Sequence, residues 1–428
     1  MIRKTPVTLM IILILGSFLR GMNLGKKPLW LDEIITALFT FGEGYQVIPT
    51  GTIFSIQAIP NFFTYQEQSC SHLANFLAEQ STHPPLFFCL LHRWLGIIET
   101  LNLFNDSLAT QLRVLPTLLG IIAIFLLYYL NQKAFSQQAG LAGAGIMAIS
   151  PFAVYLSQEA RQYSLLFVLI AIALFALVQI IKSDRNAFLS WLIWGIANSL
   201  GIYTHYFFLL SLVAQMIILF IFLVRESPRR LFLLFGMTGG VILSYLPWLP
   251  TLITHIYSPK TDWLPSFDWF APIYQLILGL IIMVVTFPIE NQPTTIQIIS
   301  ALVMLGLSGW LLYHFSLGYR KLLKDRVTQK VTLALSLYLV LVLLQFLVII
   351  YGLEKNIAIA PRYNYVYYPA IASLLGASLS ARSEQIHPAL SRKLFSIVGI
   401  IGITSCLFVV WNLFFLKPYF PEKNGSTI

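Results

Sequence analysis

The chain contains many apolar stretches long enough to cross a lipid bilayer, and this feature limits the folds open to it. A transmembrane helix needs about 20 mostly apolar residues. Segments of this kind lie near residues 5–24, 112–130, 139–156, 163–181, 187–204, 206–224, 231–250, 296–315, 331–351, 364–381 and 394–416. Backbone polar groups in lipid must be hydrogen-bonded within the protein, which makes such segments helices. The sequence therefore predicts an all-α polytopic membrane protein with about 11 transmembrane helices.

The composition excludes a soluble protein. Of the 428 residues, 57% are hydrophobic and only 10% are charged, whereas soluble domains have about a quarter charged residues. The net charge of +10 does not predict a nucleic-acid partner, because the basic residues sit in short gaps between apolar runs. No small-residue cleavage site follows the first apolar run, so we expect an uncleaved first helix. The three cysteines, Cys70, Cys89 and Cys406, predict neither a disulfide framework nor a zinc site.

Two weaker apolar segments, 84–101 and 271–289, decide the topology. If the N-terminus is cytoplasmic and neither segment crosses, the cytoplasmic loops hold sixteen basic and four acidic residues. The bases are Arg3, Lys4, Lys133, Lys182, Arg185, Arg225, Arg229, Arg230, Arg320, Lys321, Lys324, Arg326, Lys330, Arg382, Arg392 and Lys393, and the acids are Asp184, Glu226, Asp325 and Glu384. This asymmetry follows the positive-inside rule and breaks if 84–101 crosses. We therefore expect 84–101 to lie in the interface and 271–289 to be interfacial or re-entrant.

The external segment 25–110 is expected to contain juxtamembrane helices. Pro28 suits the start of a helix and Gly42 its end. Between them, Asp32, Thr36 and Thr40 fall on one face at helical spacing. No internal repeat and no separate soluble domain is visible, so residues 1–428 are expected to form one transmembrane domain.

The adjacent carboxylates Asp32 and Glu33 are the leading candidates for chemistry. Charged residues at membrane depth are costly and usually functional. One of the two is expected to be a general base that takes a proton from an acceptor hydroxyl. A divalent metal, Mg²⁺ or Mn²⁺, held by Asp32 and Glu159 is an alternative, since carboxylate oxygens suit both ions. The structural alternative is that Asp32 and Glu33 only form a solvated helix face at the membrane rim and have no role in chemistry.

A second polar cluster, Ser157 to Tyr163, lies on the same predicted external side. Its structural alternative is that Ser157 caps the next helix, with Glu159 in the first turn opposing the helix dipole. Arg161 would then reach to the interface. The functional interpretation makes Glu159 a second acid of the site and Arg161 a cation for a phosphate.

Further polar residues on this side have similar alternatives. His83, before Pro84, is either a loop histidine or part of the site. His205 lies between two spans, in an aromatic belt or in the site. The tyrosine-rich stretch that follows Arg362 is mostly typical of an interfacial belt. Arg362 itself is expected to hold a phosphate through two parallel hydrogen bonds.

The order of these motifs resembles the GT-C glycosyltransferases, most closely the branch of protein O-mannosyltransferases and aminoarabinose transferases. The motifs are Leu29-Trp30-Leu31-Asp32-Glu33, Thr82-His83-Pro84-Pro85-Leu86, Arg113 before an apolar run, Tyr155-Leu156-Ser157-Gln158-Glu159-Ala160-Arg161-Gln162-Tyr163, and Arg362-Tyr363. The resemblance implies that Asp32 is the leading catalytic position, with Glu33 beside it and Glu159 as a second external acid. The substrate-binding candidates are His83, Arg113, Arg161, Tyr163, His205, Arg362 and Tyr363.

The resemblance also implies a function. The donor is a sugar linked to polyprenyl phosphate, the reaction inverts the anomeric carbon, and no organic cofactor is required. A lipid or glycan acceptor is favoured over a protein, because the large soluble domain of the oligosaccharyltransferases is absent from the sequence. The protein is expected in the plasma (inner) membrane, with its site on the extracytoplasmic face. The alternatives are a transporter or flippase of lipid-linked sugars, which lacks support from repeat symmetry, and an O-antigen ligase or polymerase.

Overall fold

The computed structural model of the chain describes residues 5–49, 51, 53, 62–104, 107–183, 188–225, 227–258, 268–289 and 292–411, and within these ranges no strand occurs. The α-helices are α1 (Thr5–Gly21), α2 (Leu31–Phe41), α3 (Cys70–Gln80), α4 (Leu86–Thr100), α5 (Leu108–Ala134), α6 (Gln137–Ala148), α7 (Pro151–Ser157), α8 (Tyr163–Lys182), α9 (Phe188–Ile202), α10 (Phe208–Leu223), α11 (Pro228–Tyr245), α12 (Leu249–Ile256), α13 (Ala271–Ile282), α14 (Thr294–Lys324), α15 (Arg326–Leu347), α16 (Tyr368–Ser383) and α17 (Pro388–Trp411). Short 3₁₀ or π turns are η2 (Gly44–Val47), η4 (Leu246–Trp248), η6 (Val348–Gly352), η7 (Ile357–Ile359) and η8 (Pro361–Val366).

Every segment expected to span the membrane contains helix, as do both weaker segments. Among the described residues, six helices are long and apolar enough to cross a membrane: Leu108–Ala134, Tyr163–Lys182, Pro228–Ile256, Thr294–Lys324, Arg326–Gly352 and Pro388–Trp411. The pair α6 and α7 would make a seventh span, while α1, α9, α10 and α13 are apolar but shorter. These lengths support an integral membrane protein, and the count of 11 spans stays a prediction. Among the charged residues used for the topology, Arg3, Lys4, Asp184, Arg185 and Glu226 lie outside the described residues.

The core forms where α5, α6, α8 and α16 pack together. α8 is apolar and buried around nearly its whole circumference, as expected for a helix inside a bundle. Small residues allow the closest contact. A Cβ atom added to Gly376 of α16 would lie 2.5 Å from the backbone of Gly143 in α6, so this approach of two helices requires glycine.

The apolar segment 139–156 is not one straight helix. α6 ends at Ala148, α7 begins at Pro151, and the two are bent by 60°. The bend leaves the last carbonyl groups of α6 without helical partners. The buried guanidinium of Arg20 donates to two of them, those of Met147 at 2.8 Å and Ala148 at 3.0 Å. α7 can therefore leave α6 at an angle and bring residues 158–162 against α2.

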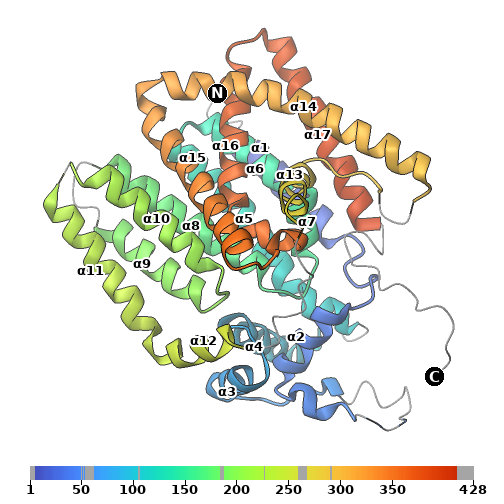
Figure 1. The fold of residues 1–428 in the computed structure, drawn as a ribbon. Helices are drawn as coiled ribbons and strands as arrows, with labels where there is room; N and C mark the ends of the chain where they lie inside the picture. Colours follow the sequence, from blue (N-terminus) through green and yellow to red (C-terminus); the bar gives the residue numbers. More distant parts are fainter. Residues whose placement is uncertain are drawn as a thin grey trace.

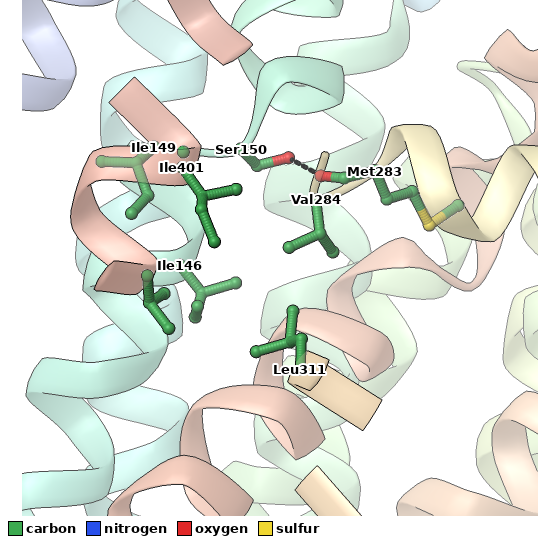
Figure 2. Close-up of a pocket in the computed structure, with 9 residues that line it drawn as sticks. Ile146, Ile149, Ser150, Met283, Val284, Leu311 and Ile401 are labelled. Atoms are coloured by element: carbon green, nitrogen blue, oxygen red, sulfur yellow. Dashed lines mark hydrogen bonds between the residues drawn. The ribbon is translucent and has the colours of Figure 1, made fainter. Parts of the chain in front are cut away.

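Segment 271–289 is only partly helical. α13 has 12 residues, about 18 Å of helix, which is shorter than the hydrocarbon core of a bilayer at about 30 Å. Two side chains hold the non-helical backbone after it: Ser150 Oγ donates to the Met283 carbonyl at 2.7 Å, and the Thr286 N–H donates to Ser405 Oγ at 3.0 Å. Figure 2 shows the first contact beside a small apolar cavity. Its volume of about 10 Å³ is hardly enough for one water molecule, and it offers no candidate chemistry.

The helices between α1 and α5 gather at one end of the bundle. Figure 1 shows α2, α3 and α4 side by side there, next to α12. α2 packs on both α3 and α4. His92 of α4 joins this group, because its Nδ1 lies 2.8 Å from the Thr40 carbonyl of α2. The end of the bundle that carries α2 is where the candidate site residues meet.

Candidate active site

α2 presents the two adjacent carboxylates. The helix begins at Leu31, three residues after the start expected from Pro28, and ends at Gly42 as predicted. Gly42 adopts the left-handed conformation with φ of 84°, which glycine allows without strain. At the start, the Trp30 N–H donates to Glu33 Oε2 at 3.3 Å. This bond turns Glu33 back toward the helix start and leaves Asp32 on a different face.

Glu33 is completely buried and forms an ion pair with Arg113 of α5. Arg113 Nε donates to Glu33 Oε1 at 2.7 Å and Arg113 Nη2 donates to Oε2 at 2.6 Å. The backbone N–H of Ala160 also donates to Oε1, at 2.8 Å. One carboxylate therefore joins α2, α5 and the turn between α7 and α8.

Arg113 uses all of its donors within the protein. Beyond Glu33, its Nη1 donates to the carbonyls of Leu24 and Lys27, and its Nη2 donates to that of Pro28. An arginine has five N–H donors, and five acceptors are present. The pair lies beneath the site rather than on its surface, and neither residue has the open position expected of a substrate contact.

Asp32 faces Arg362 instead. Arg362 Nη2 lies 3.6 Å from Asp32 Oδ2, and both side chains keep a minority of their surface exposed, 18% and 23% respectively. The Arg362 guanidinium makes cation–π contacts with two aromatic rings, 5.3 Å from the centre of the Trp30 ring and 5.7 Å from that of the Tyr363 ring. Asp32 is thus a partly accessible carboxylate beside a cation in a fixed orientation.

A second guanidinium, that of Arg161, contacts α2 at the backbone of Asp32 and at Thr36. Arg161 Nη1 donates to Thr36 Oγ1 at 2.8 Å and to the Asp32 carbonyl at 3.2 Å. Its Nη2 lies 3.0 Å from His83 Nε2. Since arginine only donates, Nε2 is the acceptor and Nδ1 carries the hydrogen that faces Ser81 Oγ at 3.1 Å. Arg161 is buried and does not extend to the interface.

The surroundings of His83 and His205 favour the neutral form of both imidazole rings. Burial, followed by the charge of Arg161, lowers the pKa of His83 well below its ordinary value. Burial and the charges of Arg161 and Arg362 lower the pKa of His205 to about 3. A neutral His83 can accept the hydrogen bond from Arg161, whereas an imidazolium cannot.

Aromatic rings form a wall next to these charges. The His205 ring lies 6.2 Å from that of His83 and 6.0 Å from that of Tyr363, while Tyr163 and Tyr365 lie 5.7 Å apart. The tyrosines after Arg362 are not an interfacial belt, since Tyr365, Tyr367 and Tyr368 have no exposed surface. Tyr365 belongs to this wall but was not among the expected site residues, because the sequence indicates it only as one member of a run of tyrosines.

Glu159 occupies the turn between α7 and α8. Its carboxylate is buried, and the Tyr155 hydroxyl lies beside it. Ser157 does not cap α8, since it is the last residue of α7 and donates to the Ala153 carbonyl at 2.6 Å. The structural alternative, in which Glu159 opposes the dipole of α8, therefore does not apply.

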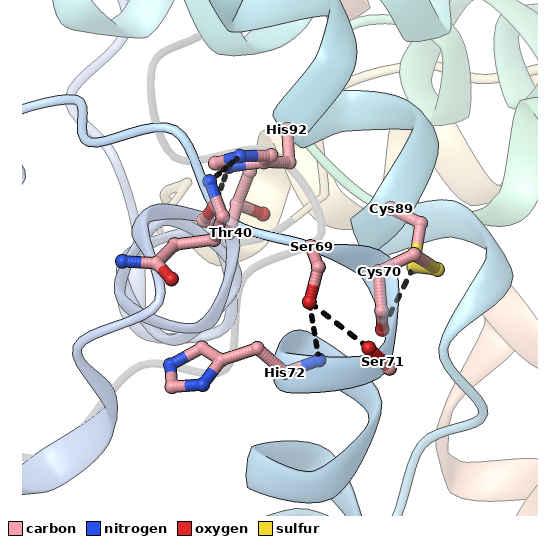
Figure 3. Close-up of a disulfide and its surroundings, with 8 residues drawn as sticks. Thr40, Ser69, Cys70, Ser71, His72, Cys89 and His92 are labelled. Carbon is pink, nitrogen blue, oxygen red and sulfur yellow. Dashed lines mark hydrogen bonds between the residues drawn. A yellow bond between two sulfur atoms is a disulfide. The ribbon is translucent and has the colours of Figure 1, made fainter.

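A disulfide joins Cys70 at the start of α3 to Cys89 in the first turn of α4 (Figure 3). This pair differs from the expectation of no disulfide framework, because cysteines 19 residues apart carry no pairing signal in the sequence. The bond closes a loop that contains Ser81 and His83. It therefore limits the movement of the residues that accept and support Arg161.

The described residues do not fit the expected metal site. Among them, no group of three or more histidine, cysteine or acidic residues could hold a metal ion. The groups next to Asp32 are the guanidinium groups of Arg161 and Arg362, which repel a cation. We therefore assign no step to Mg²⁺ or Mn²⁺.

Comparisons with known proteins identify the class of this fold. Residues 82–253 match the family described as dolichyl-phosphate-mannose-protein mannosyltransferase. No curated protein matches the chain. The resemblance to GT-C glycosyltransferases of the mannosyltransferase and aminoarabinose-transferase type is thereby confirmed.

Solved structures share the fold at low identity. The oligosaccharyltransferase AglB from Archaeoglobus fulgidus, in complex with an inhibitory peptide and a dolichol-phosphate, is 14% identical with a TM-score of 0.56. The alignment covers 95% of this chain and 55% of that protein. ArnT from Cupriavidus metallidurans, bound to undecaprenyl phosphate, is 12% identical with a TM-score of 0.54, covering 91% of this chain and 62% of ArnT. The chain thus spans little more than half the length of these proteins. Another structure of the Archaeoglobus enzyme contains zinc and sulfate.

Proposed function

We propose that this chain is an inverting glycosyltransferase that moves a sugar from a polyprenyl-phosphate-linked donor to a hydroxyl acceptor. One observation carries the proposal: the partly accessible Asp32 carboxylate lies beside the Arg362 guanidinium, and the Arg161 guanidinium contacts the backbone carbonyl of the same residue. Transfer from a phosphate-linked donor needs a base for the acceptor and cations for the leaving phosphate. Both needs are met within one small region.

Each group has a distinct role in this mechanism. Asp32 takes the proton of the acceptor hydroxyl as its oxygen attacks the anomeric carbon. The bond from that carbon to the phosphate oxygen breaks, and the leaving lipid phosphate is held by Arg362 and Arg161. Attack opposite the leaving group inverts the anomeric configuration. Charge-assisted hydrogen bonds from arginine to phosphate are about twice as strong as neutral ones.

The pair of Glu33 and Arg113 acts by position rather than by contact with substrate. It fixes α2 and the backbone of Ala160 relative to each other, and these carry Asp32 and Arg161. We assign the binding of the sugar and the acceptor to the other residues that line the same region, which are Glu159, His83, Tyr163, His205 and Tyr363.

We further propose that the chain has 11 spans and that the site lies on the extracytoplasmic face of the plasma (inner) membrane. The charge asymmetry of the loops supports this orientation. The disulfide between Cys70 and Cys89 supports it independently, because disulfides persist in oxidising compartments. The short α13, followed by buried backbone, favours a re-entrant segment over a span.

The acceptor is proposed to be a lipid or glycan, and the sugar a hexose of mannose type. The choice of a mannose-type sugar rests on the family match over residues 82–253. Purified protein in nanodiscs should transfer radiolabelled sugar from polyprenyl-phosphate mannose to a lipid or glycan extract, with inversion at the anomeric carbon. Movement of the intact donor across a vesicle membrane without its consumption would instead identify a transporter.

A further inference from the structure

A hydrogen-bonded chain inside the helix bundle ends at the segment that carries Arg362. Tyr338 of α15 donates its hydroxyl hydrogen to the carbonyl oxygen of Val366, 2.7 Å away, and Val366 is the last residue of η8. The same hydroxyl lies 2.7 Å from Ser211 Oγ of α10. None of these three residues has exposed surface. Tyr338 therefore links α10 and α15 to η8.

The hydrogen-bonded chain of side chains continues to α9. Gln215 Nε2 donates to Ser211 Oγ at 2.8 Å, and Trp194 Nε1 donates to Gln215 Oε1 at 2.8 Å. Because an indole nitrogen only donates, it fixes the orientation of the Gln215 amide. Each member can then donate a hydrogen bond to the next. The order runs from Trp194 through Gln215, Ser211 and Tyr338 to the Val366 carbonyl, which only accepts. This carbonyl cannot pass on a proton, so proton conduction is not the role.

Polar side chains inside a membrane bundle are costly and need a reason. Here the hydrogen-bonded chain of side chains holds η8, a segment that has little regular structure of its own. η8 has six residues, and a 3₁₀ turn has about three residues per turn. A shift of one residue would therefore turn Arg362 about a third of the way round, away from Asp32.

We propose that the buried hydrogen-bonded chain from Trp194 to Tyr338 positions η8 so that the Arg362 guanidinium faces Asp32 and the donor phosphate. Tyr338 and Ser211 are positioning residues in this arrangement, because they touch η8 or each other but not the site. The inference rests on the proposed function, since it depends on Arg362 binding the lipid phosphate.

The test measures the affinity for undecaprenyl phosphate of purified full-length protein in phosphatidylcholine nanodiscs. Tyr338→Phe keeps the ring and removes the hydroxyl. We expect its Kd to rise about fivefold, in the range that the loss of one hydrogen bond in a membrane protein produces. Ser211→Ala should raise the Kd by a smaller factor, and Ser211→Thr, which keeps the hydroxyl, should restore it.

The chain offers a matched control. The Tyr319 hydroxyl of α14 lies 2.7 Å from Ser336 Oγ of α15, so Tyr319→Phe removes a tyrosine–serine contact of the same kind between α15 and a different neighbouring helix. That contact has no connection to η8. Tyr319→Phe should lower the melting temperature about as much as Tyr338→Phe does, and leave the Kd unchanged.

A double-mutant cycle separates positioning from general stability. If Tyr338 acts through Arg362, Tyr338→Phe should weaken binding much less when Arg362→Ala is already present. Equal effects in both backgrounds would overturn the inference, and so would a Kd for Tyr338→Phe equal to that of the wild type. If the wild type itself binds no undecaprenyl phosphate, the proposed function fails first, and this outcome is distinct from a failure of Tyr338→Phe alone.

Discussion

Asp32 and Glu33 are adjacent in sequence but have opposite surroundings. Consecutive helical residues point about 100° apart, so only one of two neighbouring acids can face a given cleft. The helical face shared by Asp32, Thr36 and Thr40 predicts which one it is. The sequence could not show that Glu33 is paired with Arg113, because 80 residues separate them and no pattern links them.

The first prediction concerns the base. Asp32→Asn keeps the size and polarity of the side chain but cannot take a proton. We expect its transfer rate to fall by about 10²–10⁴ while it still binds the lipid phosphate. Glu67→Gln, which removes an exposed partner of Arg93, is the control and should remain fully active. An Asp32→Asn protein with normal turnover would remove Asp32 from the mechanism.

Glu33 should instead act through stability. Glu33→Gln leaves the buried guanidinium of Arg113 without a counter-charge, and breaking such a pair costs about 3–5 kcal/mol. We expect a large fall in melting temperature and a loss of activity that follows it. Because removal of both charges is often tolerated, Glu33→Gln combined with Arg113→Met should recover stability relative to Glu33→Gln alone. If the double variant is no more stable, the pair is not a structural unit.

Buried neutral histidines predict a loss of stability in acid. The pKa of His205 is about 3 in the folded protein, against about 6.5 in an unfolded chain. Below pH 6.5 the unfolded chain therefore binds a proton that the folded protein does not, so stability falls as the pH falls. At pH 5 this amounts to about 2 kcal/mol for His205. Thermal unfolding between pH 7.5 and 5 should show a shallower dependence in His205→Asn, and an unchanged slope would contradict the assignment.

Most individual helices could be predicted from the sequence, and so could the end of α2 at Gly42, whereas the bends and the pairings of the helices could not. Hydrophobic runs locate helices such as α8, because a span needs a minimum apolar length. The bend at Pro151 depends on Arg20 capping α6, a contact across 127 residues. The contact of Gly376 with Gly143 and the disulfide likewise join residues that no sequence pattern links. Such contacts arise only when the chain has folded.

The disulfide between α3 and α4 leads to a prediction about these elements. A loop of about 20 residues closed by a disulfide gains roughly 3 kcal/mol of stability, and this loop holds His83 against Arg161. Cys70→Ser combined with Cys89→Ser should therefore lower the melting temperature and weaken lipid-phosphate binding. A reducing agent should do the same to the wild type and nothing further to the double variant. Cys406→Ser, at the buried free cysteine, is the control, and an equal effect there would contradict the prediction.

At the scale of the whole molecule, the position of the candidate site in the bundle bears on the kind of donor it suits. The candidate site lies at the end of the bundle with α2, α3 and α4 (Figure 1). A donor with a long isoprenoid chain cannot leave the bilayer, so its phosphate stays at headgroup depth. A site at one end of a membrane bundle, rather than in its middle, suits such a donor.

The path of segment 271–289 decides which side of the membrane this end faces. If α13 enters and returns, Trp269 before it and Thr294 after it lie on the same side, and the exposed Lys324 at the far end of α14 lies on the other. In a Cys406→Ser background with the disulfide intact, Trp269→Cys and Thr294→Cys should react with an impermeant maleimide added outside intact cells. Lys324→Cys should react only after the cells are opened. Labelling of Trp269→Cys but not Thr294→Cys from outside would mean that α13 crosses the membrane, and the parity of spans would then contradict an extracytoplasmic site.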